Sequence, residues 1–195
     1  WNTANGANAM QYNTTGYNNT AIGSAALKAN TGGLANTAIG SNSLSSNTTA
    51  NFNTAVGNHA LRNNTGGNNT AVGSGALEFN TTGQQNSAFG LNALKSNTTG
   101  SNNTATGSNS LLANTTGSDN IAVGFEALRA NTTGTANVGI GHGALYSNTT
   151  GGNNTALGNS ALLFNTTASY NTALGYQAGV YNTTGAFGTF VGYQA

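Results

Sequence analysis

The 195-residue chain contains no cysteine and no proline, and only 4% of its residues are charged. Without cysteine, the chain can form neither disulfides nor thiolate metal sites. In typical soluble proteins about a quarter of all residues are charged. The much lower fraction in this chain argues against disorder that is driven by charge repulsion. The absence of proline also separates the chain from disordered low-complexity segments, which are often rich in it. The sequence therefore predicts an ordered protein of unusual composition.

Two further absences limit the partners of the chain. Four cations and three carboxylates give a formal net charge of +1, and no basic patch exists that could neutralise nucleic-acid phosphates. The chain also lacks a signal peptide and any apolar run near the about 20 residues that a membrane-spanning helix needs. We expect no nucleic-acid partner and no membrane span.

The chain consists instead of asparagine, threonine and glycine in a strict repeat. Its 35 asparagines and 31 threonines make up a third of the residues, and glycine adds 29 more. The phrase N-T-A-[IVL]-G-x-x-A-L-x-x-N-T-T-G-x-x recurs twelve times at a spacing of 17 residues, except for one step of 16 between Gly57 and Gly73. Such tandem repeats contact mainly their neighbours, which predicts an elongated solenoid.

We number positions within the repeat from the alanine of N-T-A, which is position 0, and we number the coils 1 to 12. The residues at position 0 are Ala4, Ala21, Ala38, Ala55, Ala71, Ala88, Ala105, Ala122, Gly139, Ala156, Ala173 and Phe190.

Each repeat contains two short apolar segments separated by glycine, one at positions 0 and 1 and one at positions 5 and 6. Threonine and β-branched residues favour strands, and N-T-T-G is good turn chemistry. The pattern predicts an all-β fold, a parallel β-solenoid (β-roll) of about twelve 17-residue coils, each with two short strands and a turn. A helical repeat is the alternative, but glycine interrupts the apolar pairs and costs about 1 kcal/mol relative to alanine within a helix.

The whole chain, residues 1–195, is predicted to be one repeat domain. Neither end carries the atypical polar cap that usually terminates a solenoid. We therefore expect a segment of a longer fibre, or ends that are buried against something else.

The apolar residues form rows along the predicted solenoid. Adjacent strand residues point to opposite faces, so the small residues at position 0 are expected inside and the large residues at position 1 outside. An outer apolar row exceeds what a soluble monomer usually exposes, and it predicts packing between copies of the chain in a homo-oligomeric fibre. The row consists of Ile22, Ile39, Val56, Val72, Phe89, Val123, Ile140, Leu157, Leu174 and Val191.

One alternative to inter-chain packing stays open: a two-sheet monomer whose interior takes both rows.

A third row, at position 7, holds every lysine and arginine of the chain, so it is expected to face water. Its charged members are Lys28, Arg62, Glu78, Lys95 and Arg129.

Several phrases resemble known repeats, namely N-T-A-I-G at 19–23, N-T-A-L-G at 154–158 and F-V-G-Y-Q-A at 190–195. They are similar to the head repeats of trimeric autotransporter adhesins, and more closely to repeats of phage tail-fibre and bacterial surface-fibre proteins. The resemblance covers the whole chain. It implies a left-handed parallel β-roll with three chains around one axis, located outside the cell or on a virion. It also implies an adhesive or spacer role toward a cell-surface glycan or host receptor. The 17-residue repeat is longer than that of the adhesin heads, so handedness and trimer geometry stay open.

No catalytic, cofactor or metal constellation is visible. His59 and His142 lie five coils apart, too far to share a metal, and the carboxylates Glu78, Asp119 and Glu126 fall in different repeats. This spacing leaves neither an acid/base pair nor a cage for calcium. We expect that the protein is not an enzyme.

The turn asparagines are the remaining candidate for chemistry, because many of them lie in N-x-[ST] sequons. One interpretation is a column of glycans; the other is an unmodified ladder of stacked amides that bond to one another along the fibre. We favour the ladder for a bacterial or phage fibre. The candidates are Asn13, Asn47, Asn63, Asn80, Asn97, Asn114, Asn131, Asn148, Asn165 and Asn182, with Asn18, Asn68, Asn102 and Asn153 just ahead of the first strand.

These observations favour a non-enzymatic segment of an extracellular fibre, acting as a rigid spacer or adhesive surface. One alternative is a self-assembling filament whose subunits stack end to end and carry N-glycans. An ice-binding solenoid is another, because threonine recurs at the position before the alanine, although Ser87, Ile121 and Val138 interrupt that row. The last alternative function is that of a carbohydrate-binding module.

Overall fold

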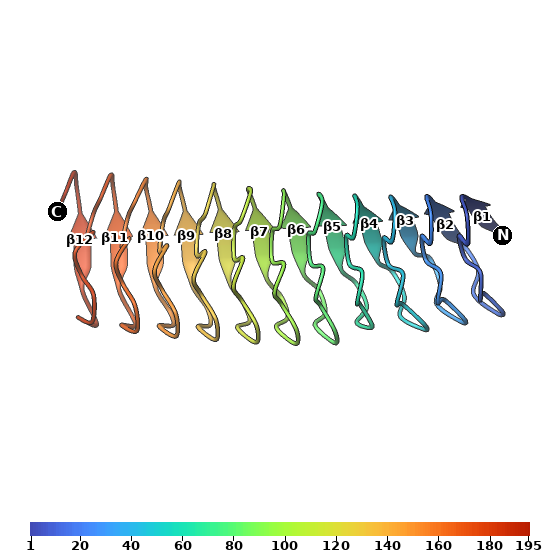
Figure 1. Cartoon of the computed structure of the whole chain (residues 1–195). Coiled ribbons are helices and arrows are strands. Elements are labelled where there is room, and N and C mark those ends of the chain that lie inside the picture. Colours follow the sequence, from blue (N-terminus) through green and yellow to red (C-terminus); the bar gives the residue numbers. More distant parts are fainter.

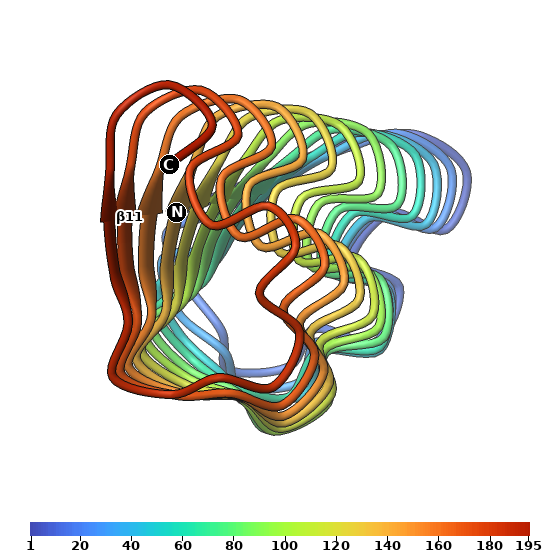
Figure 2. The same cartoon turned by 90° about the vertical axis from the view of Figure 1, so that its left-hand side faces the viewer.

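The computed structural model describes all 195 residues, Trp1 to Ala195, as one stack of coils (Figure 1). Each coil contributes one short strand, and the twelve strands form a single parallel sheet in chain order, which gives eleven complete turns. Seen end-on, the coils lie over one another and the strands form one wall (Figure 2). The predicted parallel β-solenoid is confirmed. The strands are β1 (Asn2–Asn5), β2 (Asn19–Ile22), β3 (Thr37–Ile39), β4 (Thr54–Val56), β5 (Thr70–Val72), β6 (Ser87–Phe89), β7 (Thr104–Thr106), β8 (Ile121–Val123), β9 (Val138–Ile140), β10 (Thr155–Leu157), β11 (Thr172–Leu174) and β12 (Thr189–Val191).

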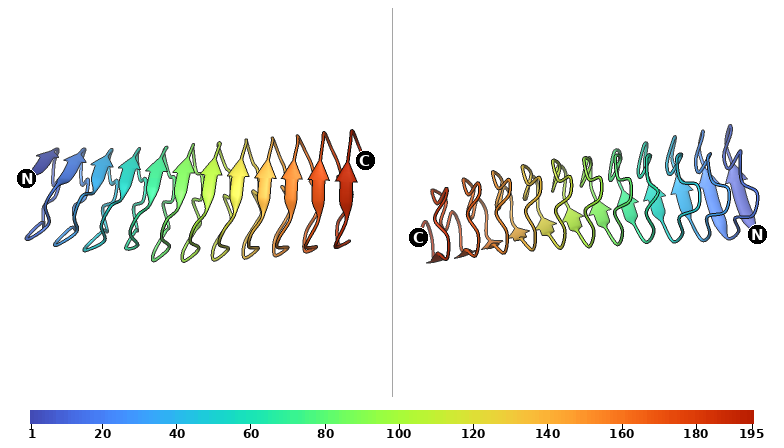
Figure 3. Two further views of the ribbon diagram at one scale, coloured as in Figure 1. Left: turned by 180° about the vertical axis from the view of Figure 1, so that it is seen from behind. Right: turned by 90° about the horizontal axis from the view of Figure 1, so that it is seen from below.

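The register of the sheet is constant from end to end, and the strands stay in line in both views of Figure 3. At the one 16-residue step, Ala55 pairs with Ala71 and Val56 pairs with Val72, as in every other pair of coils. A slip of one residue would turn the outer side chains inward. The missing residue is therefore absorbed in the turn, as predicted.

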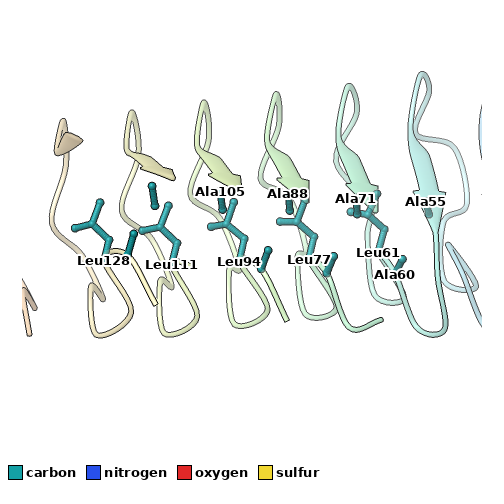
Figure 4. Packing of buried hydrophobic residues seen from close by; sticks show 14 of the residues in the cluster. Ala55, Ala60, Leu61, Ala71, Leu77, Ala88, Leu94, Ala105, Leu111 and Leu128 are labelled. Atoms are coloured by element: carbon teal, nitrogen blue, oxygen red, sulfur yellow. The ribbon is translucent and has the colours of Figure 1, made fainter. Parts of the chain in front are cut away.

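The interior of the solenoid is narrow and contains two apolar columns. The alanines at position 0 are fully buried from Ala21 to Ala156, and so are the leucines at position 6 from Leu27 to Leu162. Figure 4 shows the two columns, with Leu94 and Leu111 reaching from the opposite wall toward the strand. An alanine is all that fits between strand and leucine, so the large residues at position 1 point outward. The two-sheet alternative is therefore wrong.

The second apolar segment is not a strand, and that prediction is also wrong. Ala26 and Leu27 are adjacent and both fully buried, whereas neighbouring residues of a strand face opposite sides. The chain achieves this burial by left-handed backbone conformations on both sides of the alanine, with φ of 56° at Ala25 and 51° at Leu27. The same conformations recur in the other coils and curl this wall inward.

Position 2 requires glycine in every coil. Gly23 has a φ of +126°, a value that side-chain-bearing residues rarely adopt. A Cβ atom added there would also lie only 2.7 Å from the carbonyl carbon of Gly40 in the next coil. Backbone conformation and close stacking therefore both explain this glycine.

Coils 11 and 12 exchange large and small residues in the interior. Position 0 is Phe190, and its ring lies over Gly179 and Gly188, which stand where other coils have leucine and asparagine. A Cβ atom at Gly179 would come within 2.8 Å of the ring, and one at Gly188 within 2.6 Å. The phenylalanine therefore fills volume that the two glycines leave, a swap of the kind that packed cores tolerate.

Candidate functional surfaces: the outer strand face and the asparagine ladders

The outer face of the sheet carries the apolar row at position 1. Its side chains are exposed because the strand alternates, with position 0 inside and position 1 outside. Exposure ranges from 36% at Val72 to 62% at Val191, and Val56 is half-buried. Thr106 is the one polar interruption between Ile22 and Val191. An exposed apolar row of this length on a sheet is typical of an interaction surface.

The threonine row lies on the same face, one column away. Its members, such as Thr37 and Thr54, are half-buried or exposed at the residue before the alanine. The interruptions by Ser87, Ile121 and Val138 remain, and the exposed ring of Phe89 adds bulk to the face. The face is thus a mixed threonine and aliphatic surface rather than a uniform hydroxyl array.

The asparagines at position 9 form a buried ladder along the stack. In all but two steps, those into Asn47 and Asn165, the side-chain amide nitrogen donates to the side-chain oxygen of the preceding asparagine, at 2.7 Å from Asn97 to Asn80 and 2.8 Å from Asn114 to Asn97. The same nitrogen also donates to the turn carbonyl of its own coil, as from Asn114 to Gly117 at 2.9 Å. The predicted inward-facing amide ladder is confirmed. Further steps continue it through Asn131, Asn148 and Asn165.

A second ladder occupies position 15, just before each strand. Asn103 receives a bond from the backbone N–H of Asn120 at 3.0 Å, and its amide nitrogen donates to Gly117 O at 2.9 Å. Gly117 O therefore accepts from both ladders and ties the turn to the strand side of the coil. We had no prediction of this ladder, although asparagine recurs at position 15 as regularly as at position 9. Each net hydrogen bond contributes about 1 kcal/mol, so the two ladders stabilise the contacts between most successive coils.

Most of the proposed glycan acceptors lie inside these ladders. Seven of the ten are fully buried, and their amide nitrogens already donate within the protein: Asn47, Asn80, Asn97, Asn114, Asn131, Asn148 and Asn165. A glycan on such a nitrogen would break the ladder. Asn13, Asn63 and Asn182 are half-buried, and the second group of sequons, Asn18, Asn68, Asn102 and Asn153, is exposed.

Charged side chains gather around Glu78 instead of facing water along the whole of position 7. Glu78 is only 6% exposed. Its carboxylate lies 3.2 Å from Arg62 Nη1, 3.4 Å from Lys95 Nζ and 3.8 Å from His59 Nδ1. Both cations also lie over the ring of Phe79. The prediction that position 7 faces water is wrong for Glu78, because cations from both neighbouring coils cover it.

The histidines do not meet. His59 lies beside Glu78, and His142 stacks on Phe125 with the ring centroids 5.4 Å apart. No group of three or more histidine, cysteine or carboxylate side chains is placed to hold a metal ion. The structure contains no helix that could span a membrane.

The geometry defines a structural repeat protein, a β-solenoid held together by stacked asparagine ladders. Comparison with protein-family models, curated proteins and solved structures found no match. The particular role of the chain therefore has to be argued from its surfaces.

Proposed function

We propose that the chain is a rigid, non-enzymatic segment of an extracellular fibre, in which copies of the chain pack through the outer strand face. The exposed apolar row at position 1 is the observation that carries this proposal. It runs the length of the sheet, with exposures of 41% at Ile22 and 46% at Leu174 near the two ends. Burying such a row against another copy gains about 25 cal/mol for each Å² of apolar surface removed from water.

Rigidity follows from the interior. The apolar columns continue from coil to coil and the asparagine ladders run along most of the stack, so bending the rod would strain hydrogen bonds and packing together. A rod of this kind suits a spacer, or a surface that presents an adhesive site to a cell-surface glycan or receptor. The resemblance to adhesin heads and tail fibres supports this role and a trimeric arrangement.

Substitution of the apolar row tests the proposal. Ile39→Asp and Val123→Asp should each convert an assembled wild type into monomers, because a buried unpaired charge is costly. Mass photometry measures the assembly state. Thr99→Asp is the matched control, since Thr99 is exposed on the turn, away from the strand, and should leave assembly unchanged.

Two outcomes would change the assignment. A monomeric wild type would refute packing through the row. Open-ended growth in place of a closed oligomer would favour the filament with end-to-end subunits, because head-to-tail contacts that do not close generate filaments.

A further inference from the structure

A notch of about 310 Å³ lies on the outer surface between coils 8 and 10. It opens at position 4 of coil 9, where the residue is Gly143, whereas the adjacent coils carry Glu126 and Ser160 there. Small-molecule sites span about 300–1,000 Å³, so the notch is large enough for one small ring. A larger hollow, about 450 Å³, is lined by Tyr181 and Phe190 and by the amides of Gln177, Asn182 and Gln194 in coils 11 and 12, where the described coils end.

Glycine alone does not create the notch, as a second glycine at position 4 shows. At Gly75, a Cβ atom would meet Asn92 Oδ1 at 2.7 Å and Glu78 Oε2 at 3.6 Å. Neighbouring side chains therefore occupy the space over Gly75. At Gly143 the nearest contacts are Leu163 Cδ1 at 3.3 Å and Ser160 Oγ at 3.9 Å, and the space outside them is open.

One wall of the notch is aromatic. The ring of Phe164 is 44% exposed and is braced by Tyr181, which stacks on it with centroids 6.1 Å apart. The ring of Tyr146 lines the same notch. Arg129 Nη1 donates a 3.0 Å hydrogen bond to the Tyr146 hydroxyl oxygen, which leaves the hydroxyl proton free to bond a ligand.

The remaining walls are polar and carry little net charge. Glu126, His142 and Ser160 contribute a carboxylate, an imidazole and a hydroxyl. Glu126 Oε1 lies 3.3 Å from Arg129 Nε, so the carboxylate charge is balanced within the protein although the pair lacks hydrogen-bond geometry. The notch therefore offers no unpaired charge that would attract a charged ligand.

We infer that this notch binds a neutral saccharide ring. A pyranose presents an apolar face of C–H groups, which can pack on an aromatic ring, and a rim of hydroxyls, which needs mixed donors and acceptors. Phe164 supplies the ring surface, because the Arg129 guanidinium lies over the ring of Tyr146. The Tyr146 hydroxyl, Glu126, His142 and Ser160 supply the polar partners. The site does not depend on assembly of the chain, and it adds a recognition function to the proposed structural role.

Saturation-transfer difference NMR tests the site with glucose, galactose, mannose and N-acetylglucosamine, each at millimolar concentration. At least one sugar should receive saturation from the wild-type chain. Gly143→Asn should abolish that transfer by filling the notch. The fold accommodates this change, because Asn42, Asn92 and Asn109 occupy position 4 in other coils with φ between 55° and 58°.

Asn42→Gly is the matched control. It opens space at position 4 of coil 3, where positions 7 and 8 are Ser45 and Ser46, and should bind no additional sugar. Phe164→Ala should weaken transfer, with an unchanged circular dichroism spectrum as evidence of folding. If none of the four sugars receives saturation, or if transfer survives Gly143→Asn, the inference is overturned. A monomeric wild type would refute only the fibre proposal.

Discussion

The short coil around Asn64 and the regular coils from Asn97 onward differ by one residue in the turn, and the difference shows how the solenoid is held together. Strand register is identical in both regions. In the regular region the ladder asparagines from Asn97 to Asn165 each bond to the one before, as Asn114 does to Asn97. In the short coil, Asn64 donates to Gly66 O at 2.6 Å and makes no bond to Asn47.

Two buried polar atoms beside the shortened turn lack partners, Asn47 Oδ1 and Asn53 Nδ2; the same two atoms also lack partners at Asn165 and Asn171, near the C-terminal end of the stack. Asn69 donates across the interior to Asn64 Oδ1 at 3.1 Å, a bond between ladders that replaces the usual bond along one ladder. An unsatisfied buried group costs about 1–3 kcal/mol. The strands therefore tolerate the deletion, whereas the asparagine ladders do not.

Alanine substitution of a ladder asparagine should give the largest difference in unfolding free energy between the two regions. Asn114→Ala removes two donor bonds and the bond accepted from Asn131, and it orphans Asn97 Oδ1, with an expected loss of about 2–4 kcal/mol. Asn47→Ala likewise removes two donor bonds and orphans Asn30 Oδ1, but it loses no accepted bond because Asn47 Oδ1 has no partner, and it should cost about 1–2 kcal/mol. Urea unfolding measures both, and hydrogen exchange in the flanking coils localises the loss.

Thr99→Ala, on the exposed turn, is the control and should change stability little. Equal losses for Asn114→Ala and Asn47→Ala would contradict the ladder account, because packing alone would then explain both variants.

Restoring the missing residue should produce a smaller effect of opposite sign. A threonine inserted after Thr65 gives the turn N-T-T-G-G-N-N-T, which residues 148–155 already form in coil 9. Partners for Asn47 Oδ1 and Asn53 Nδ2 should return, and stability should rise by about 1–3 kcal/mol. Thermal or urea unfolding measures the gain.

The same insertion after Thr149, in a turn of full length, is the matched control and should destabilise the chain. If both insertions destabilise it to the same degree, the short coil is not strained in the way proposed.

The sequence predicted the periodic features of the fold because periodicity maps directly onto stacking. Repetition every 17 residues predicted the solenoid, and the alternation of Ala38 and Ile39 predicted which row lies inside. The turn asparagines suggested a ladder because identical side chains in register meet their copies. These inferences need only neighbouring coils, and neighbours are what a repeat specifies.

The errors concern features that a repeat pattern does not encode. Left-handed conformations at leucine are rare, so nothing in the Ala26-Leu27 pair signalled that it curls rather than extends. Burial of Glu78 depends on Arg62 and Lys95 occurring in the coils on either side of it, a non-periodic coincidence. The notch at Gly143 likewise depends on the particular side chains of three successive coils.

The smallest expected difference in stability is between neutralising Glu78, beside the short coil, and neutralising Glu126, in a regular coil. Glu78→Gln removes the carboxylate from three basic partners and should cost about 1 kcal/mol, because the cations are one-third exposed and can be hydrated. Glu126→Gln, with a side chain 23% exposed and one partner, should cost less than about 0.5 kcal/mol. Urea unfolding at low and high salt compares them, since salt of about 1 M shortens the screening length to about 3 Å. The loss at Glu78 should persist more fully in high salt because burial shields the group.

Glu78 also bears on the order in which the coils stack. Position 7 holds leucine or tyrosine in several other coils, as at Leu112 and Tyr146. If the coils paired in a wrong order, Glu78 would be buried between such residues without a cation. Equal, fully screened losses for the two variants would show that Glu78 is an ordinary surface charge with no part in fixing the order of the coils.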